Sequence, residues 1–117
     1  MDRHPSSWQP LVPEALNTVP AAAGVFEVAN LVRNVRFIDA GAGNLRERLA
    51  PFAEWQMKLP PSPGGYYFRY LRVDHEHEAL NASLDAYRES HRGLPPPMNS
   101  AQAERASEGR VERRQAA

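Results

Sequence analysis

Residues 24–49 read GVFEVANLVRNVRFIDAGAGNLRERL, and this stretch decides the fold that the sequence predicts. Residues 24–28 alternate apolar and polar positions, as a strand with one buried face does. Residues 30–34 form a short turn region, and residues 35–38 predict a second strand. The stretch therefore predicts that the folded part of the chain opens with a β-hairpin.

A helix is expected directly after this hairpin. Gly41-Ala42-Gly43 breaks the second strand, and Asn44 stands at the N-cap, where its side chain can accept a hydrogen bond from a first-turn amide. An apolar stripe at the spacing i, i+4, i+7 marks the buried face of this helix. The stripe consists of Leu45, Leu49 and Phe52. Pro51 has no backbone donor, so the helix must be short or kinked.

A third strand and a second helix are predicted further along the chain. Residues 66–73, YYFRYLRV, are rich in aromatic and β-branched side chains and give the strongest strand signal. Asp74 is the expected N-cap of a helix that runs to about Arg92 and stops at Gly93. The inner stripe of this helix is predicted to be Leu80, Leu84, Tyr87 and His91.

The predicted order β-β-α-β-α favours an α+β domain with a small three-stranded sheet, mixed or antiparallel, flanked by helices. This domain is expected at residues 19–99. Residues 1–18 predict an arm that packs its apolar side on the domain. Residues 100–117 have almost no large apolar side chains and predict a disordered or weakly helical tail. The expected core is Phe26, Phe37, Leu45, Leu49, Phe68, Leu80 and Leu84, partly covered by Trp55, Met57 and Leu59.

Composition limits the possible functions. The 117 residues contain no cysteine, which excludes disulfides, cysteine-ligated zinc and a thiol nucleophile. No apolar run is long enough to span a membrane and residues 1–10 lack a secretory-signal pattern, so a cytoplasmic location is the default expectation. The formal net charge is zero, and residues 20–99 carry nine basic and nine acidic side chains. This balance argues against a nucleic-acid binder, which usually has a basic excess.

Several segments resemble the GIY-YIG nuclease superfamily. The residues that carry the resemblance are Pro20 before Gly24-Val25-Phe26, Phe37-Ile38-Asp39, Asn44-Leu45-Arg46-Glu47-Arg48-Leu49, Glu78-Ala79-Leu80 and Pro96-Pro97-Met98-Asn99. The match covers residues 19–99, the third segment is its most specific part, and Asn99 keeps the family's residue type. The resemblance implies the GIY-YIG fold and, where the site is intact, metal-dependent hydrolysis of phosphodiesters.

The chain departs from the family at the positions that carry the chemistry. The family uses a tyrosine on each of two strands, an arginine on the first helix and a metal-binding glutamate on a later helix. The matching positions hold Phe26, then Phe37 or Ile38 depending on register, Arg48 and Ser83. Phenylalanine cannot transfer a proton, and a lone serine is a poor Mg²⁺ ligand. The resemblance therefore implies a degenerate, non-catalytic member. The alternative is a nuclease with a shifted site around Arg48, which would need Mg²⁺.

Two other patterns have plainer structural explanations. His75 and His77 point apart on a helix because they are two residues apart, so a solvated helix start is preferred to a metal site. Gly41-Ala42-Gly43 precedes a helix and could bind an anion on its backbone amides, although a tight turn is favoured. No metal site and no small-molecule cofactor are predicted.

The nature of the partner is predicted from the distribution of charge. The available phosphate contacts are Arg36, Arg46, Arg48, Arg69 and Arg72. Asp39 and Glu47 lie beside them in the sequence and repel the same phosphates, which offsets the gain from counterion release. The apolar arm with Trp8, the proline-rich segment and the charged tail are typical of segments that order on a protein. A protein partner is therefore favoured over nucleic acid.

Overall fold

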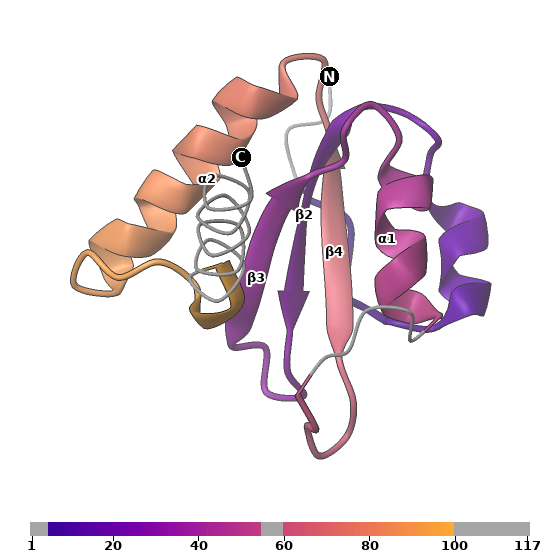
Figure 1. The fold of residues 1–117 in the computed structure, drawn as a ribbon, viewed down its shortest axis with the longest axis horizontal. Helices are drawn as coiled ribbons and strands as arrows, with labels where there is room; N and C mark the ends of the chain where they lie inside the picture. Colours follow the sequence, from indigo (N-terminus) through magenta and orange to yellow (C-terminus); the bar gives the residue numbers. More distant parts are fainter. Residues whose placement is uncertain (1–4, 55–59, 100–117) are drawn as a thin grey trace, which may run out of the picture.

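One antiparallel sheet of four strands organises the chain, in the order β1-β4-β2-β3 (Figure 1). The computed structural model describes residues 5–54 and 60–99. Its strands are β1 (Gln9–Pro10), β2 (Gly24–Ala29), β3 (Val35–Ala40) and β4 (Tyr67–Arg72). Its main helices are the 3₁₀ helix η1 (Pro13–Thr18) and the α-helices α1 (Leu45–Ala53) and α2 (Glu76–Ser90). The α+β class is therefore confirmed.

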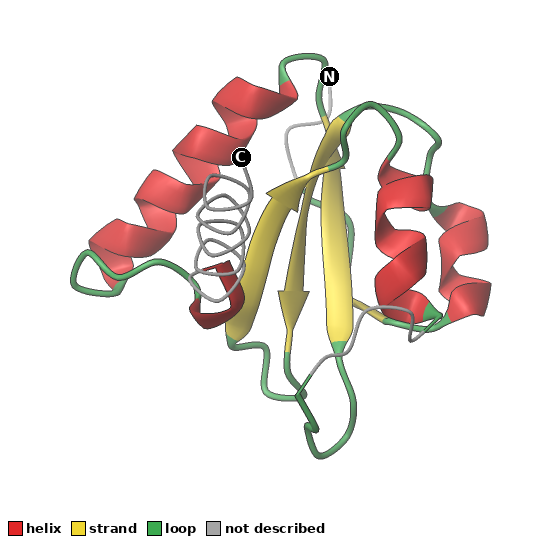
Figure 2. Ribbon diagram, in the orientation of Figure 1, coloured by secondary structure: helices red, strands yellow, loops and turns green. Residues whose placement is uncertain are grey.

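The sheet lies between two layers of helix, with α1 and η1 on one side and α2 on the other (Figure 2). Phe26 and Val28 of β2 point toward α1, because alternate residues of a strand face the same side. The rest of the main core on this side is Leu11, Leu16, Val19, Phe37, Leu45, Leu49, Phe52, Ala53 and Phe68. Val25 and Ile38 point the opposite way, toward α2, and are also buried. Burial is thus confirmed for five expected core residues: Phe26, Phe37, Leu45, Leu49 and Phe68.

Residues 24–49 form the local elements that their pattern predicts, although β2 is buried on both faces rather than on one because helices cover both sides of the sheet. β2 and β3 pair antiparallel as a hairpin. Asn44 caps α1, and its side chain accepts a hydrogen bond from the Glu47 amide at 3.1 Å. α1 has only nine residues and carries Pro51 inside it, in agreement with the expected short helix. These features depend on side chains a few positions apart, which is why the sequence alone predicts them.

The expectation of a three-stranded sheet is wrong, because the N-terminal arm supplies a fourth strand. In β1, Gln9 pairs with Phe68 and Pro10 with Tyr67 of β4. The arm packs its apolar side on the sheet, and Leu11 and Leu16 are buried in the main core. A strand of two residues is too short for an alternating pattern, so only the contact with β4 identifies it. The domain boundary at residue 19 stays a prediction.

α2 is buried less deeply than its apolar stripe predicts. Leu80 and Leu84, expected in the core, are half-buried, and α2 contains no buried residue. The helix lies against β3 and β2, and a helix that packs on a sheet from one side leaves the flanks of its stripe partly open. Leu80, Leu84 and Tyr87 therefore mark the correct face of α2, although the stripe overestimates its burial. The prediction is wrong for His91, which is exposed at the C-cap because the helix ends before it.

The ends of α2 match the predicted limits only in part. The N-cap is His75 rather than Asp74, and it makes no side-chain capping hydrogen bond, so the prediction of Asp74 is wrong. Asp74 lies one position before this cap, and the first-turn carboxylate of Glu76 accepts from amides of other elements rather than from α2. Gly93 adopts φ +81°, and its amide donates to the Arg88 carbonyl at 2.7 Å. α2 nevertheless ends at Ser90, before the predicted limit of about Arg92, and Gly93 belongs to the turn that follows the helix.

Some expectations concern residues outside the described ranges. These are the covering role of Trp55, Met57 and Leu59 and the state of residues 100–117. Within residues 5–54 and 60–99, no helix has the length and the apolar character needed to cross a membrane.

Candidate functional site

Phe26 on β2 and Phe37 on β3, two residues of the candidate site, lie in the main core. Phe26 is 0% exposed and Phe37 is 3% exposed. Their rings pack with that of Phe52, with centroids 5.5 to 6.1 Å apart. The register of the hairpin places Phe37 on the same face as Phe26, whereas Ile38 points toward α2. Both rings are enclosed by apolar neighbours, and the family position that matches Phe37 or Ile38 stays open.

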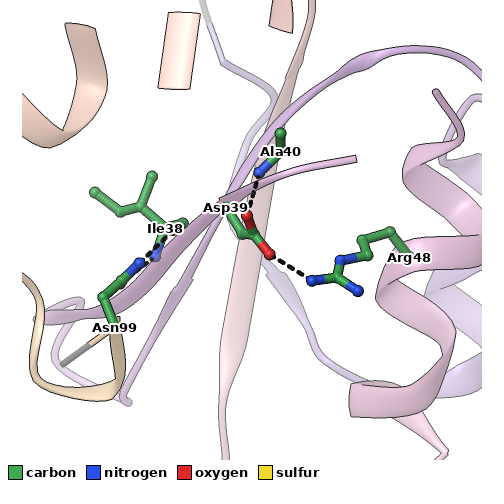
Figure 3. A network of polar contacts seen from close by, with 5 residues as sticks. All are labelled: Ile38, Asp39, Ala40, Arg48 and Asn99. Atoms are coloured by element: carbon green, nitrogen blue, oxygen red, sulfur yellow. Dashed lines mark hydrogen bonds and ion pairs between the residues drawn. The ribbon is translucent and has the colours of Figure 1, made fainter. Parts of the chain in front are cut away.

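Arg48 reaches from α1 to β3 and pairs with Asp39 (Figure 3). One guanidinium nitrogen lies 2.7 Å from Oδ2 of Asp39, and the two side chains are 47% and 24% exposed. The other carboxylate oxygen, Oδ1, accepts a hydrogen bond from the Ala40 amide at 2.8 Å. The Asp39 carboxylate is therefore held at both oxygens, and it offsets the charge of Arg48.

Ser83 lies on the other side of the sheet from this pair. It belongs to α2 and borders a cavity of about 70 Å³ whose wall includes Glu27 and Arg69. Asp39 stands opposite Phe26 in the register and so shares the α1 face, whereas α2 covers the opposite face. The structure therefore separates Arg48 from Ser83. The cavity is much smaller than the roughly 300–1,000 Å³ of ordinary small-molecule sites.

Most of the arginines that sequence suggested as phosphate contacts are engaged within the chain. Arg46 donates through Nε to the Val19 carbonyl at 2.8 Å, which ties α1 to the arm. Arg69 forms an ion pair with Glu27, its cross-strand neighbour. The Arg69 guanidinium also lies 4.5 Å from the centroid of the Trp8 ring. Two more arginines are exposed on the strands, Arg36 and Arg72.

Asn99 makes two hydrogen bonds to the backbone of β3 (Figure 3). Its Oδ1 accepts from the Ile38 amide at 3.0 Å, and its Nδ2 donates to the Ile38 carbonyl at 2.7 Å. Its own amide donates to the Pro96 carbonyl at 3.0 Å. The side chain therefore lies along the outer edge of the sheet and does not approach Arg48 or Ser83.

Glu76 makes long-range contacts that the sequence analysis did not predict. Its carboxylate accepts hydrogen bonds from the Gly24 amide at 3.1 Å and from the Gly43 amide at 3.0 Å. The Gly43 amide of the Gly41-Ala42-Gly43 turn is thus bonded to a carboxylate of the same chain. No local signal marks this contact, because Glu76 lies 33 and 52 residues from its partners.

His75 and His77 are exposed at the start of α2. In the part of the chain that the structure describes, no three His, Cys, Asp or Glu side chains are grouped so that they could hold a metal ion.

Burial raises the pKa of the Tyr66 hydroxyl, and the nearby charge of Arg36 opposes the change. This hydroxyl donates to the Pro60 carbonyl at 2.6 Å and closes the loop before β4.

Comparison with known proteins adds no family assignment. No protein-family model matches the chain, and neither a curated protein nor a solved structure matches it. The functional argument therefore depends on the geometry of the described residues.

Proposed function

We propose that this chain is a non-catalytic GIY-YIG-like domain that serves as an accessory or binding subunit of a protein complex. The packing of Phe26 and Phe37 carries this proposal. Hydrolysis of a phosphodiester needs a group that activates water and groups that stabilise developing charge. Two phenylalanine rings enclosed in the core supply neither. At these positions the two side chains pack in the core and supply no group for catalysis.

The position of the other two site residues supports the same proposal. Groups that act on one substrate must converge within hydrogen-bonding reach of it. Arg48 pairs with Asp39 on the α1 face, whereas Ser83 belongs to α2 on the other face. An intervening layer of sheet keeps the two side chains from sharing a substrate.

The engaged arginines favour a protein partner over nucleic acid. A guanidinium that is already paired with a carboxylate releases fewer counterions when a phosphate approaches. Arg48 and Arg69 are both paired in this way, with Asp39 and Glu27. The turn of the β2–β3 hairpin also exposes adjacent aliphatic side chains, Leu31 at 48% and Val32 at 71%. Such apolar surface is suited to burial against a protein.

The alternative function is a metal-dependent endonuclease with a shifted site, which would require Mg²⁺. One observation favours it: Asp39 supplies a carboxylate beside the half-exposed Arg48. Carboxylate oxygens are the ligands that Mg²⁺ prefers. The alternative therefore predicts a nuclease activity that depends on Arg48 and on a divalent cation.

The proposal is tested by incubating the purified full chain with plasmid DNA and Mg²⁺ or Mn²⁺. We expect no cleavage, and we expect tagged protein to capture a defined protein that remains bound after nuclease treatment of the lysate. The nuclease treatment matters because it removes proteins bridged to the chain by nucleic acid.

Control variants distinguish the outcomes. Arg88 forms a similar ion pair with Asp85 on α2, at 3.6 Å, and Arg88→Ala therefore matches Arg48→Ala in chemistry. Cleavage that is lost in Arg48→Ala and in a chelator, but kept in Arg88→Ala, would refute the non-catalytic proposal. Tight duplex binding with a steep salt dependence that Arg46→Glu abolishes would refute the preference for a protein partner.

A further inference from the structure

The side of the sheet that faces α2 is only partly covered. A helix is about 10 Å wide and strands lie about 4.8 Å apart, so one helix covers about two strands. α2 lies against β3 and β2. Three half-buried side chains of β4 share this side of the sheet: Tyr67, Arg69 and Leu71. Together with the half-buried Trp8 of the arm, they form what we call the open face of β4.

Arg69 is held in place on this open face by two contacts. Its Nε donates to the carboxylate of Glu27, which stands opposite it on β2. Its guanidinium carbon lies 4.5 Å from the centroid of the Trp8 ring, within the range of a cation–π interaction. The side chain is nevertheless 32% exposed. A guanidinium fixed in this way loses little conformational freedom when it binds a further group.

Arg69 also keeps hydrogen-bond donors for a ligand. A guanidinium has five N–H donors, and Glu27 accepts from the one on Nε. Among the residues that the structure describes, none accepts a hydrogen bond from either Nη atom of Arg69. The two Nη atoms therefore offer the planar fork that binds both oxygens of a carboxylate or a phosphate.

A cavity of about 70 Å³ lies beside Arg69. Its wall is mainly apolar and includes Pro5, Val25 and Leu71. Burial of an aliphatic group against such a wall removes apolar surface from water on both sides. The cavity thus suits an aliphatic side chain that lies next to the group bound by Arg69.

The charge of the open face favours an acidic ligand. The guanidinium carbon of Arg33 lies 3.9 Å from the centroid of the Tyr67 ring. Within the described part of the chain, Arg33 has no carboxylate partner. The surface therefore combines two guanidiniums with the single carboxylate of Glu27. Nucleic acid fits it less well, because bases stack on aromatic faces and the rings of Tyr67 and Trp8 each already carry a guanidinium.

We propose that the open face of β4 binds an acidic segment of a partner protein. A carboxylate of the segment binds the two Nη atoms of Arg69, and a neighbouring aliphatic side chain enters the cavity. The proposal rests on the proposed role as a binding subunit and names the chemistry of its partner. A carboxylate brings one negative charge close to Glu27, whereas a phosphate monoester brings about two and meets more repulsion.

The test titrates the isotopically labelled full chain with short peptides and follows it by NMR. Each peptide carries one Asp or Glu and one Leu or Val, and the set varies the separation between them. We expect at least one peptide to shift the Nε–H signal of Arg69 and the indole N–H signal of Trp8. The same peptide with Asn or Gln in place of the acid should bind about tenfold more weakly or worse, because a charge-assisted pair is lost. Replacement of the aliphatic residue by Ala should also weaken binding.

Variants of the chain assign the contact to Arg69. Arg69→Lys keeps the positive charge beside Glu27 but lacks the fork, so it should bind the acidic peptide more weakly. Arg88→Lys is the matched control, because Arg88 is also paired with a carboxylate, that of Asp85 on α2, and its binding should be unchanged. If Arg69→Lys does not fold, the comparison of acidic and amide peptides on the parent chain still decides.

Three outcomes would overturn the proposal. In the first, no peptide of the set shifts the Arg69 and Trp8 signals, and in the second the amide peptides shift them at the same concentrations as the acidic ones. In the third, a single-stranded oligonucleotide binds at these signals more tightly than any acidic peptide, which assigns the face to nucleic acid. These outcomes are distinct from those of the plasmid and salt tests above, which report on Arg46 and Arg48 of α1, across the sheet.

Discussion

A single carboxylate joins three elements of the fold. Glu76 opens α2 and accepts hydrogen bonds from Gly24 at the start of β2 and from Gly43 in the turn before α1. Hydrogen bonds to a charged acceptor are stronger than those between neutral groups. The same carboxylate lies in the first turn of α2, where the helix dipole favours a negative charge.

Glu76→Ala is expected to lower the free energy of unfolding by about 1–3 kcal/mol, because two backbone amides lose their acceptor. Urea denaturation followed by circular dichroism measures the change. Glu78→Ala serves as the control, since Glu78 is exposed two positions further along α2 and should cost less than about 0.5 kcal/mol. Equal unfolding midpoints for the two variants would show that the Glu76 contacts contribute nothing.

At the scale of elements, β2 is the centre of the sheet, and its first residue sits where three elements converge. A Cβ added to Gly24 would lie 2.5 Å from the Leu71 carbonyl oxygen and 2.6 Å from a methyl group of Leu45. The first of these atoms is backbone and cannot move without disturbing β4. Gly24 therefore allows β2, β4 and α1 to approach one another.

Gly24→Ala is expected to destabilise the fold by about 2–3 kcal/mol or more, because overpacking forces the backbone of β4 to shift. Thermal unfolding by circular dichroism checks this. At Gly65 the added Cβ would meet nothing within 4 Å, although φ is +77°, so Gly65→Ala should cost only about 1 kcal/mol of backbone strain. A Gly24 variant no less stable than the Gly65 variant would contradict the close approach.

At the scale of the whole molecule, the arm completes the core on the α1 side. β1 extends the sheet, and η1 places Leu16 against the core at 7% exposure. The Tyr70 hydroxyl donates to the Thr18 carbonyl at 3.2 Å, and Arg46 donates to the Val19 carbonyl at 2.8 Å. Apolar burial and polar contacts therefore both tie the arm to the rest of the fold.

Leu16→Ala in the full chain is expected to cost about 2–5 kcal/mol, the usual range for a buried leucine. Leu94→Ala is the matched control, because Leu94 is 65% exposed and should have an effect below about 0.5 kcal/mol. The same unfolding measurements on residues 19–117 test the expected boundary. Wild-type stability of that shortened chain would show that the arm only covers a domain that folds without it.

The sequence by itself determined the elements whose signals are local. The β2–β3 hairpin, the Asn44 cap of α1, the α1 stripe and the turn at Gly93 after α2 all depend on residues a few positions apart. Backbone conformation and side-chain alternation act over that range, so these elements can be predicted from the sequence alone. Phe26 is also recognisable in the sequence as a side chain that cannot transfer a proton, whatever its packing.

Only the tertiary structure decided how these elements meet. The pairing of β1 with β4, the half-burial of Leu80 and Leu84, and the separation of Arg48 from Ser83 depend on which faces come together. Glu76 and Asn99 reach partners 33 to 61 residues away. A carboxylate or a carboxamide bonds any backbone amide that the fold brings near, and sequence spacing does not record which one that is.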